Sequence, residues 1–370
     1  MPSRVVFLII FILINILLFH AEEQNNKSKD IRVPLLTQYD LYYSHVQIRN
    51  ESFNILWDTG TTTNAVDSEF LISIGATKDV AYNSKAKVTL KVPLSNLKAN
   101  ISFLPYDFSK INKFIDIDCI IGYPLFNTFT VEFDFNDCEI ILHNKDYNIE
   151  KISDSTAYSF TFEICGFKPI IECKINGQFY KMLIDTGYNG GIGVVDKKYI
   201  ISSEIINYEG LIGTGFFENK INQSYIKVDD VEILNEVFKD IYIRDNCGNN
   251  TTIDKNGNLS TPTDFQLMVG TAFFKDCLLV LDYQNKKGLF LRKKGSYIPP
   301  FPMPFRIDND LTIQGINVSQ DNNPFRRNDR IISVNGNTNI SYDDIRYSYG
   351  RTTGNTYTLI RDGSQITIQY

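Results

Sequence analysis

The sequence is poor in the residues that build metal sites. Its 370 residues include only three histidines, at positions 20, 45 and 143, and no two cysteines have the Cys-x-x-Cys spacing. Zinc sites in proteins take their ligands from clusters of such residues. The sequence therefore predicts no metal site, and it contains no signal for any other cofactor.

Positive charge is not in excess either. Lysine and arginine number 37 against 43 aspartates and glutamates, which gives a formal net charge of -6. The basic residues are not clustered, whereas nucleic-acid binding needs a positive face, so we expect no nucleic-acid partner. What the chain does have is 43% hydrophobic residues, with 26 phenylalanines and 21 tyrosines. This composition indicates a globular core built mainly from strands.

Only one long hydrophobic run occurs, at the N-terminus. Val5–Phe19 follows Arg4 and is interrupted only by Asn15. Its length is typical of a secretory signal peptide over residues 1–21, because a membrane span needs about 20 apolar residues. An uncleaved anchor is the alternative, and only then would the protein contact a membrane. In both cases the folded part is exported, to the periplasm, the cell surface or the medium.

Six cysteines follow this segment, at positions 119, 138, 165, 173, 247 and 277. An even number in an oxidising compartment permits disulfides. Cys165 and Cys173 flank a predicted hairpin turn at Gly166–Pro169, so they are the first expected pair. The alternative is that several of the six stay free and buried, as small apolar residues.

One pattern occurs twice. Phe53–Val66 (FNILWDTGTTTNAV) contains an apolar strand that ends in Asp58-Thr59-Gly60. Phe179–Val194 (FYKMLIDTGYNGGIGV) contains another, which ends in Asp185-Thr186-Gly187. The two acids are 185 − 58 = 127 residues apart. Solenoid repeats have periods of roughly 20–50 residues, so this period indicates two fused lobes.

A second motif follows each copy. Ile120-Ile121-Gly122 comes after the first acid and Met268-Val269-Gly270 after the second. Asp and Gly are common in turns, so a turn without chemistry is the alternative for each Asp-Thr-Gly. Two copies, each after an apolar strand and before an apolar-apolar-Gly, argue against that alternative and for two carboxylates brought together.

Paired carboxylates have a specific chemistry. Two carboxyl groups about 3 Å apart cannot both ionise, so one keeps a proton and the other does not. The charged member can deprotonate a water while the protonated member polarises a carbonyl, which hydrolyses an amide without a metal. A glycine beside each acid lets the backbone approach the other carboxylate closely.

On these motifs the chain resembles the aspartic peptidases of the pepsin and retropepsin superfamily. It is similar in particular to bacterial aspartyl-protease-like proteins that carry a C-terminal PDZ-like domain. The resemblance covers residues 38–370. It implies an all-β, two-lobed fold with a pseudo-two-fold axis, followed by a small PDZ-like domain. An extended peptide would bind in the cleft between the lobes, beneath a flap.

The resemblance also implies roles for individual residues. Asp58 and Asp185 would be the catalytic pair. The supporting residues would be Thr59, Gly60, Thr61, Gly122, Thr186, Gly187, Tyr188 and Gly270. Tyr188 departs from the family, which usually has Ser or Thr there, so a bulky ring beside the pair could narrow the cleft or weaken activity. For the flaps we expect Tyr82 in the first lobe and Gly210–Gly215 in the second.

Polar and proline-rich segments divide the chain. The expected parts are a signal peptide (1–21), a spacer (22–37), a first lobe (38–146), a second lobe (156–295), a proline-rich linker (296–304) and a PDZ-like domain (305–370). The PDZ resemblance is clearest at Phe325–Gly336 (FRRNDRIISVNG), although Asn328 replaces the usual glycine. Leu311–Val318 is the expected groove strand. The alternative is a small β-domain that only packs on the peptidase.

The sequence therefore predicts an exported aspartic endopeptidase that acts on peptide or protein substrates. A chain-end peptide is a further expected partner, at the PDZ-like domain. The alternative is a catalytically weak or inactive relative that binds peptides through that domain. A homodimer that combines one lobe from each chain is not required, because both lobes already carry an acid.

Overall fold

The computed structural model describes residues 30–48, 50–76, 87–94, 97–109, 116–143, 147–152, 154–195, 200, 204–210, 223–245, 252–253, 259–260, 264–295, 297–299, 303–308 and 310–370. The predicted signal peptide (1–21), Tyr82 and all but the first residue of Gly210–Gly215 lie outside these ranges. Over the described residues no helix is long and apolar enough to cross a membrane.

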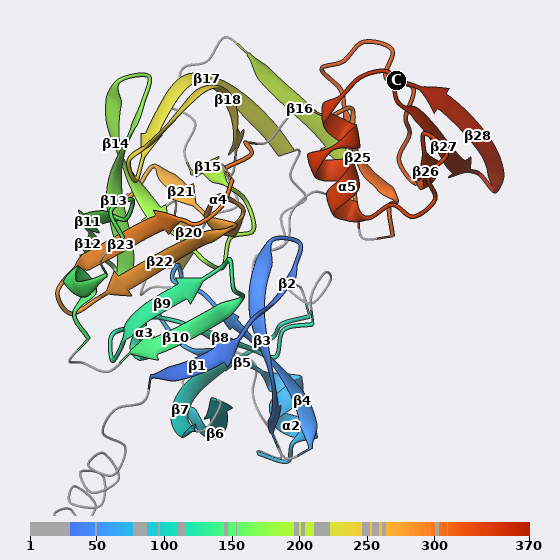
Figure 1. Ribbon diagram of the computed structural model, residues 1–370. Helices are drawn as coiled ribbons and strands as arrows, with labels where there is room; N and C mark the ends of the chain where they lie inside the picture. The colour runs from blue at the N-terminus through green and yellow to red at the C-terminus, as the bar shows by residue number, and fades with distance from the viewer. Residues whose placement is uncertain are drawn as a thin grey trace, which may run out of the picture.

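The described chain forms two β-rich lobes and a C-terminal module, which follow one another from bottom to right in Figure 1. Its helices are short: α2 Ser68–Ser73, α3 Tyr123–Phe126, α4 Thr271–Phe274, α5 Tyr342–Tyr347 and the 3-10 turns η1 Ile149–Lys151 and η3 Tyr349–Arg351.

The first lobe is built on a seven-stranded sheet. In spatial order its strands are β2 Leu36–Gln38, β3 Leu41–Ile48, β4 Glu51–Trp57, β8 Cys119–Ile121, β5 Ala65–Asp67, β7 Leu97–Tyr106 and β6 Val88–Leu94. The strand before the first acid, β4, pairs in parallel with β8, which carries the apolar-apolar-Gly motif. The last three residues of β4, Ile55–Trp57, and all of β8 are apolar and buried, because they lie in the core.

The second lobe repeats this arrangement within a larger sheet. Its strands, in spatial order, are β12 Glu163–Cys165, β13 Lys168–Ile175, β14 Gln178–Ile184, β21 Leu267–Val269, β15 Ile192–Val194, β18 Glu236–Asp245, β17 Gln223–Ile233 and β16 Ile205–Gly210. As in the first lobe, β14 pairs in parallel with β21, and β15 pairs antiparallel with β21. A separate two-stranded ribbon joins β19 Thr252–Ile253 and β20 Leu259–Ser260.

A six-stranded sheet joins the two lobes. Its order is β1 Ile31–Pro34, β10 Glu139–His143, β9 Thr130–Asp134, β22 Cys277–Asp282, β23 Lys287–Arg292 and β11 Tyr158–Thr161. Its central pair, β9 with β22, comes from different lobes. The hydrophobic core therefore continues from one lobe into the other.

The strand β1 corrects the predicted spacer. Residues 22–37 were expected to be a spacer, but Ile31–Pro34 pairs antiparallel with β10, and Ile31 and Val33 are buried. The apolar residues of this strand alternate over only four positions, and a polar segment precedes them. The sequence pattern is therefore too short to predict a strand. The first lobe therefore begins at β1 and not at residue 38.

The C-terminal module has its own small core and two sheets. The strands β26 Arg330–Val334, β27 Thr356–Arg361 and β28 Ser364–Gln369 form one sheet. The strands β24 Phe305–Ile307 and β25 Ile313–Asn317 extend the ten-stranded sheet of the second lobe. A capping box at Ser341 and Asp344 starts α5. The buried residues Phe305, Phe325 and Tyr357 centre a core separate from that of the lobes.

Two predictions for this module are wrong in detail. Leu311–Val318 was expected to offer a groove strand, but β25 already pairs with β24 on one side and β16 on the other. The proline-rich stretch 296–304 was expected to be a linker, yet Tyr297 and Met303 are both buried. The module is therefore attached to the second lobe by strand pairing and packed side chains.

The predicted disulfide is also wrong. All five cysteines that the structure describes are free thiols, Cys165 and Cys173 among them. Cys165 is opposite Lys168 in the ladder, and Cys173 lies five residues further along β13. At roughly 3.3 Å per residue that separation is about 16 Å, which no disulfide can span.

Candidate active site

The two acids occupy equivalent positions at the ends of equivalent strands. Asp58 directly follows β4, and its N–H donates to the carbonyl of Ile121 at 2.9 Å. Asp185 directly follows β14, and its N–H donates to the carbonyl of Val269 at the same distance. Each apolar-apolar-Gly strand therefore fixes the backbone of the acid in its own lobe.

The two threonines brace the loops against each other. The hydroxyl of Thr59 accepts from the N–H of Thr186 at 3.0 Å and donates to the carbonyl of Ile184 at 2.7 Å. Reciprocally, the hydroxyl of Thr186 accepts from the N–H of Thr59 at 3.0 Å and donates to the carbonyl of Trp57 at 2.6 Å. Both threonines are buried, so these four bonds hold the loops in a fixed relation.

The glycines allow the acids to approach each other. A Cβ on Gly60 would lie 2.6 Å from the carboxyl of Asp185, and one on Gly187 would lie 2.6 Å from Oδ2 of Asp58. The glycine N–H groups are also used. Gly60 donates to Oδ1 of Asp58 at 2.7 Å, and Gly187 donates to Oδ1 of Asp185 at 3.0 Å. Any side chain at either position would push the carboxyls apart.

The electrostatic environment separates the two carboxyls. Burial raises the pKa of Asp58 well above its ordinary value, and the charge of Asp185 raises it further. Burial also raises the pKa of Asp185, but the charge of Lys168 and hydrogen bonds from Asp58, Gly187 and Tyr188 oppose this rise. Asp58 therefore holds the shared proton and Asp185 the negative charge. Both residues are only half-buried, so solvent reaches them.

Two residues near the pair were not predicted from the sequence. Lys168 begins β13, and its charge lowers the pKa of both acids. Its neighbour Phe167 reaches the first lobe, where its ring lies 4.8 Å from that of Tyr123. Tyr283 is fully buried, and the charges of both acids add to the burial that raises its pKa. Lys168 and Tyr283 belong to neither of the two repeated motifs, so the motifs could not identify them.

Tyr188 does not lie over the acids. Its ring packs with a buried cluster of the second lobe that includes Leu183 and Met268, and the guanidinium of Arg244 lies 5.7 Å from the ring centroid. The backbone of Tyr188 serves the loop: its N–H donates to the carbonyl of Asp185 at 3.2 Å. The ring at this position is therefore part of the packing of the second lobe.

The remaining predicted residues support the loops. The N–H of Tyr123 donates to the carbonyl of Thr61 at 3.3 Å. A Cβ on Gly122 would lie 2.8 Å from that same carbonyl oxygen, so only glycine fits. In the second lobe a Cβ on Gly270 would lie 2.6 Å from the ring of Tyr188. The structure thus brings all ten predicted site residues into two contacting loops and their supports.

A cavity lined in part by the second lobe does not include the acids. It has a volume of about 580 Å³ and runs along β11, β12 and β13 on the outer side of the second lobe. None of its lining residues belongs to the two acid loops. Among the described residues no three His, Cys, Asp or Glu side chains gather as metal ligands do.

Comparison with known proteins adds little to this geometry. No protein-family model and no curated protein matches the chain. Among solved structures it is similar to basic 7S globulin from soybean, with 11% sequence identity and a TM-score of 0.37. That likeness covers 71% of this chain and 94% of the globulin chain.

The class of the protein follows from its own geometry. Two β-lobes with equivalent topology share a central sheet, and an Asp-Thr-Gly loop from each meets the other between them. This is a two-lobed, all-β fold of the pepsin-like type, which confirms the predicted fold class. It is followed by a small module with its own core.

Proposed function

We propose that the protein is an aspartic endopeptidase. The observation that carries the proposal is the pair of half-buried carboxyls on mutually braced loops, both with a raised pKa and Asp58 with the larger rise. Asp185 would deprotonate a water molecule that attacks the scissile carbonyl. Asp58 would donate a hydrogen bond to that carbonyl oxygen and stabilise the developing charge. A peptide or protein chain in extended conformation is the substrate class.

The mechanism needs no covalent intermediate. The water adds its oxygen to the carbonyl carbon as Asp185 takes up its proton, and the proton of Asp58 passes to the carbonyl oxygen. Collapse of the tetrahedral species breaks the carbon–nitrogen bond. The leaving amine receives a proton from Asp185, and Asp58 recovers its own from the hydroxyl. Both carboxyls return to their starting states.

The proposal is tested by incubating the purified protein with a denatured protein mixture across acidic to neutral pH. The Asp58→Asn and Asp185→Asn variants serve as controls, with circular dichroism to check that they fold. We expect fragments from the wild type and a loss of roughly 1,000-fold or more in each variant. Equal cleavage by wild type and variants would assign the fragments to a contaminant and end the proposal.

The rival function is peptide binding without hydrolysis. Two observations weigh against it: the ring of Tyr188 packs away from the carboxyls, and β16 occupies one edge of β25. It gains support only if the wild type leaves every substrate intact while still binding labelled peptides. Deletion of residues 305–370 would then be expected to remove the binding.

Export is a separate proposal, which rests on Val5–Phe19. Expression of the full chain followed by N-terminal sequencing of the exported product distinguishes a cleaved signal from an anchor. A product beginning near residue 22 in the soluble exported fraction supports the signal peptide. Intact chain in the membrane fraction supports the anchor, and intact chain in the cytoplasm contradicts export.

A further inference from the structure

A small cavity lies where the C-terminal module meets the second lobe. Three arginines of the module line it: Arg306 from β24, Arg346 from α5 and Arg351 from η3. Gly191 of the second lobe and the buried Tyr297 of the connecting segment also contribute. The lining includes no Asp or Glu from the described chain.

Two of the three arginines have partners in the protein. Nη1 of Arg346 pairs with Oδ2 of Asp40 at 2.5 Å, across to the first lobe. Nη2 of Arg351 donates to the carbonyl of Pro299. Asp40 is thus the carboxylate that the first lobe supplies to this cluster.

Arg306 is the arginine whose donors remain unused. Its guanidinium lies over the rings of Tyr208 and Tyr225, at 4.9 and 4.5 Å from their centroids. Its Nε and Nη2 atoms are buried and have no hydrogen-bond partner among the described residues. Ring faces attract a cation but do not satisfy its N–H groups. Two strong donors therefore remain without acceptors beside a cavity.

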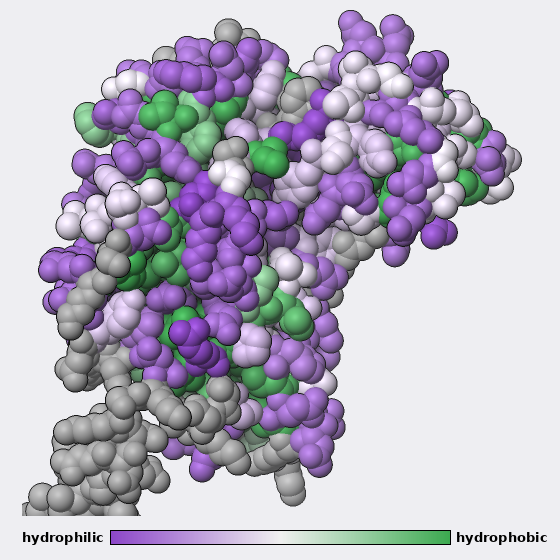
Figure 2. All heavy atoms as spheres, viewed as in Figure 1, coloured by the Kyte–Doolittle hydropathy of each residue, from purple (hydrophilic) through white to green (hydrophobic). Residues whose placement is uncertain are grey.

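The charges of the cluster act on Arg351. Burial lowers the pKa of Arg351, and the charges of Arg346 and Arg306 lower it further. A buried positive charge needs a paired negative one, and an unsatisfied charged donor is costly. On the face in Figure 2 strongly hydrophilic residues lie along the seam between the module and the second lobe.

We propose that this cavity binds a small oxyanion of the size of inorganic phosphate or sulfate. The planar guanidinium of Arg306 would hold two of its oxygens, since this fork matches oxyanions better than any other side chain. The cavity volume is about 20 Å³, which is far below the space of a peptide.

The bound anion would fasten the module to the second lobe. It would connect β24, α5 and η3 to Gly191, which lies six residues after Asp185 in the same loop. It would add to the pairing of β16 with β25 and to the hydrogen bond from the hydroxyl of Tyr208 to the carbonyl of Met303, which already join the two parts. Anion binding is therefore expected to stabilise the whole chain, independently of any hydrolysis.

The test is a titration of the full exported chain with phosphate at constant ionic strength, followed by thermal unfolding. We expect a saturable rise in Tm of roughly 2–4 °C in the wild type, because a ligand that binds only the folded state stabilises it. Isothermal titration calorimetry should give one site per chain. Arg330→Gln, which removes an exposed arginine of the same module, is the matched control and should behave like the wild type.

The effect of Arg306→Gln on stability should change sign between buffer without oxyanions and buffer with phosphate. In dialysed buffer without oxyanions the variant should be as stable as the wild type or more so, since an uncompensated charge is gone. In saturating phosphate it should be less stable and show no phosphate-dependent rise. Arg306→Lys keeps the charge but not the fork, so we expect phosphate affinity reduced about tenfold.

Three results would overturn the inference. One is an unchanged wild-type Tm over the phosphate titration. Another is an equal loss of stability for Arg306→Gln in both buffers, which would mean that Arg306 acts only by packing on Tyr208 and Tyr225. The third is displacement of phosphate by a short peptide with a free C-terminus but not by its amidated form. That result would assign the cavity to a chain end in place of a free ion.

Discussion

The two acid loops make the same hydrogen bond with different groups. In the first lobe Oδ1 of Asn64, six residues after Asp58, accepts from the N–H of Gly122 at 3.0 Å. In the second lobe the carbonyl of Gly191, six residues after Asp185, accepts from the N–H of Gly270 at 2.9 Å. Both loops therefore keep an acceptor for this glycine N–H, but the acceptor is a side chain in one lobe and the backbone in the other.

The reason for the difference lies in the C-terminal module. A side chain at position 191 would collide with the hydroxyl of Tyr297, in the segment that leads to the module. The first lobe carries no such attachment, so it keeps a side chain there. The second lobe also has Lys168 near its acid, which separates the two carboxyls electrostatically. The lobes thus agree in how they brace the acids and differ in what surrounds them.

The hydrogen bonds of Thr59 and of Thr186 should contribute equally to stability. Their loss should have the largest effect of the changes considered. Thr59→Val and Thr186→Val each remove two buried hydrogen bonds and leave an N–H unpaired. We expect each to lower the free energy of unfolding by roughly 2–4 kcal/mol, measured in urea. The double variant should cost less than the sum, because the two residues share bonds.

Threonine-to-serine variants at the same positions keep the hydroxyl and serve as controls. A large cost for one valine variant and none for the other would show that a single lobe supplies the bracing.

The close approach of the loops should matter next most. Gly60→Ala and Gly187→Ala each place a methyl group 2.6 Å from Oδ2 of the opposite carboxyl. We expect activity to fall by about 100-fold in each, since displacements of about 1 Å have effects of that size. Peptide cleavage is the measurement, and Thr62→Ala, an exposed position in the same loop, is the control. Full activity in either glycine variant would contradict the carboxyl-to-carboxyl contact.

The differing supports should respond differently to change. Asn64→Ala leaves the N–H of Gly122 without an acceptor, and we expect a loss of roughly 1–3 kcal/mol in unfolding free energy. Gly191→Ala keeps the backbone acceptor but forces Tyr297 to move, with a similar loss from overpacking. The fluorescence of Tyr297 should change in the second variant only. A change in both would mean that the lobes are coupled through this segment.

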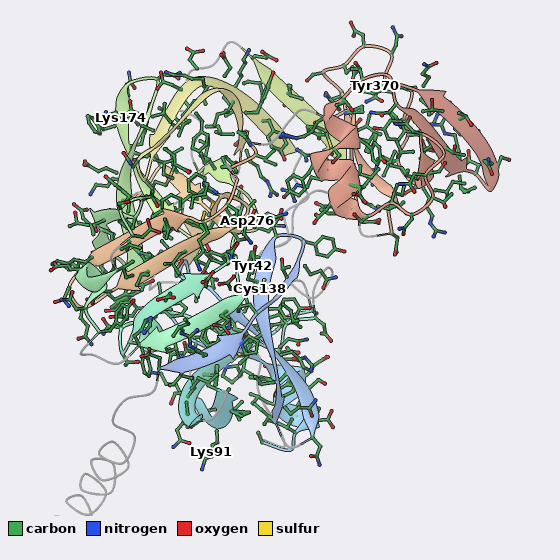
Figure 3. All side chains as sticks on the ribbon, in the orientation of Figure 1. Tyr42, Lys91, Cys138, Lys174, Asp276 and Tyr370 are labelled. Carbon is green, nitrogen blue, oxygen red and sulfur yellow. The ribbon has the colours of Figure 1, made fainter. Side chains whose placement is uncertain are left out.

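The smallest effect concerns pH. Removing the charge in Lys168→Met should raise the pKa of Asp185, which must be ionised to act as base. The acid limb of the pH–activity profile should then move to higher pH, by up to about one unit. Lys174→Met, on the outer part of the same strand (Figure 3), is the matched control. An unmoved limb, or a shift to lower pH, would remove Lys168 from the site.

Most of the correct predictions came from short sequence patterns. The two Asp-Thr-Gly turns, their apolar strands and the supporting glycines lie within short segments whose repetition reveals their pairing. In the C-terminal module the strand expected at Leu311–Val318 also exists, as β25. The fold class and the pair of acids are therefore predictable from the sequence alone.

What the sequence could not supply depends on long-range contacts. The partner of β1 is more than 100 residues away, and that of β25 is in another part of the protein. The arginine cavity combines residues of β24, α5 and η3, each of which is ordinary in its own segment. Cys165 and Cys173 are close in sequence, but an extended strand keeps them apart.

The most direct measurement is an NMR titration of the two carboxyl carbons, assigned with the Asp58→Asn and Asp185→Asn variants. We expect Asp58 to titrate well above the ordinary range and above Asp185, and its pKa to fall when Asp185 is replaced by asparagine. Two carboxyls that titrate independently, both in the ordinary range, would contradict a shared proton and with it the proposed hydrolysis.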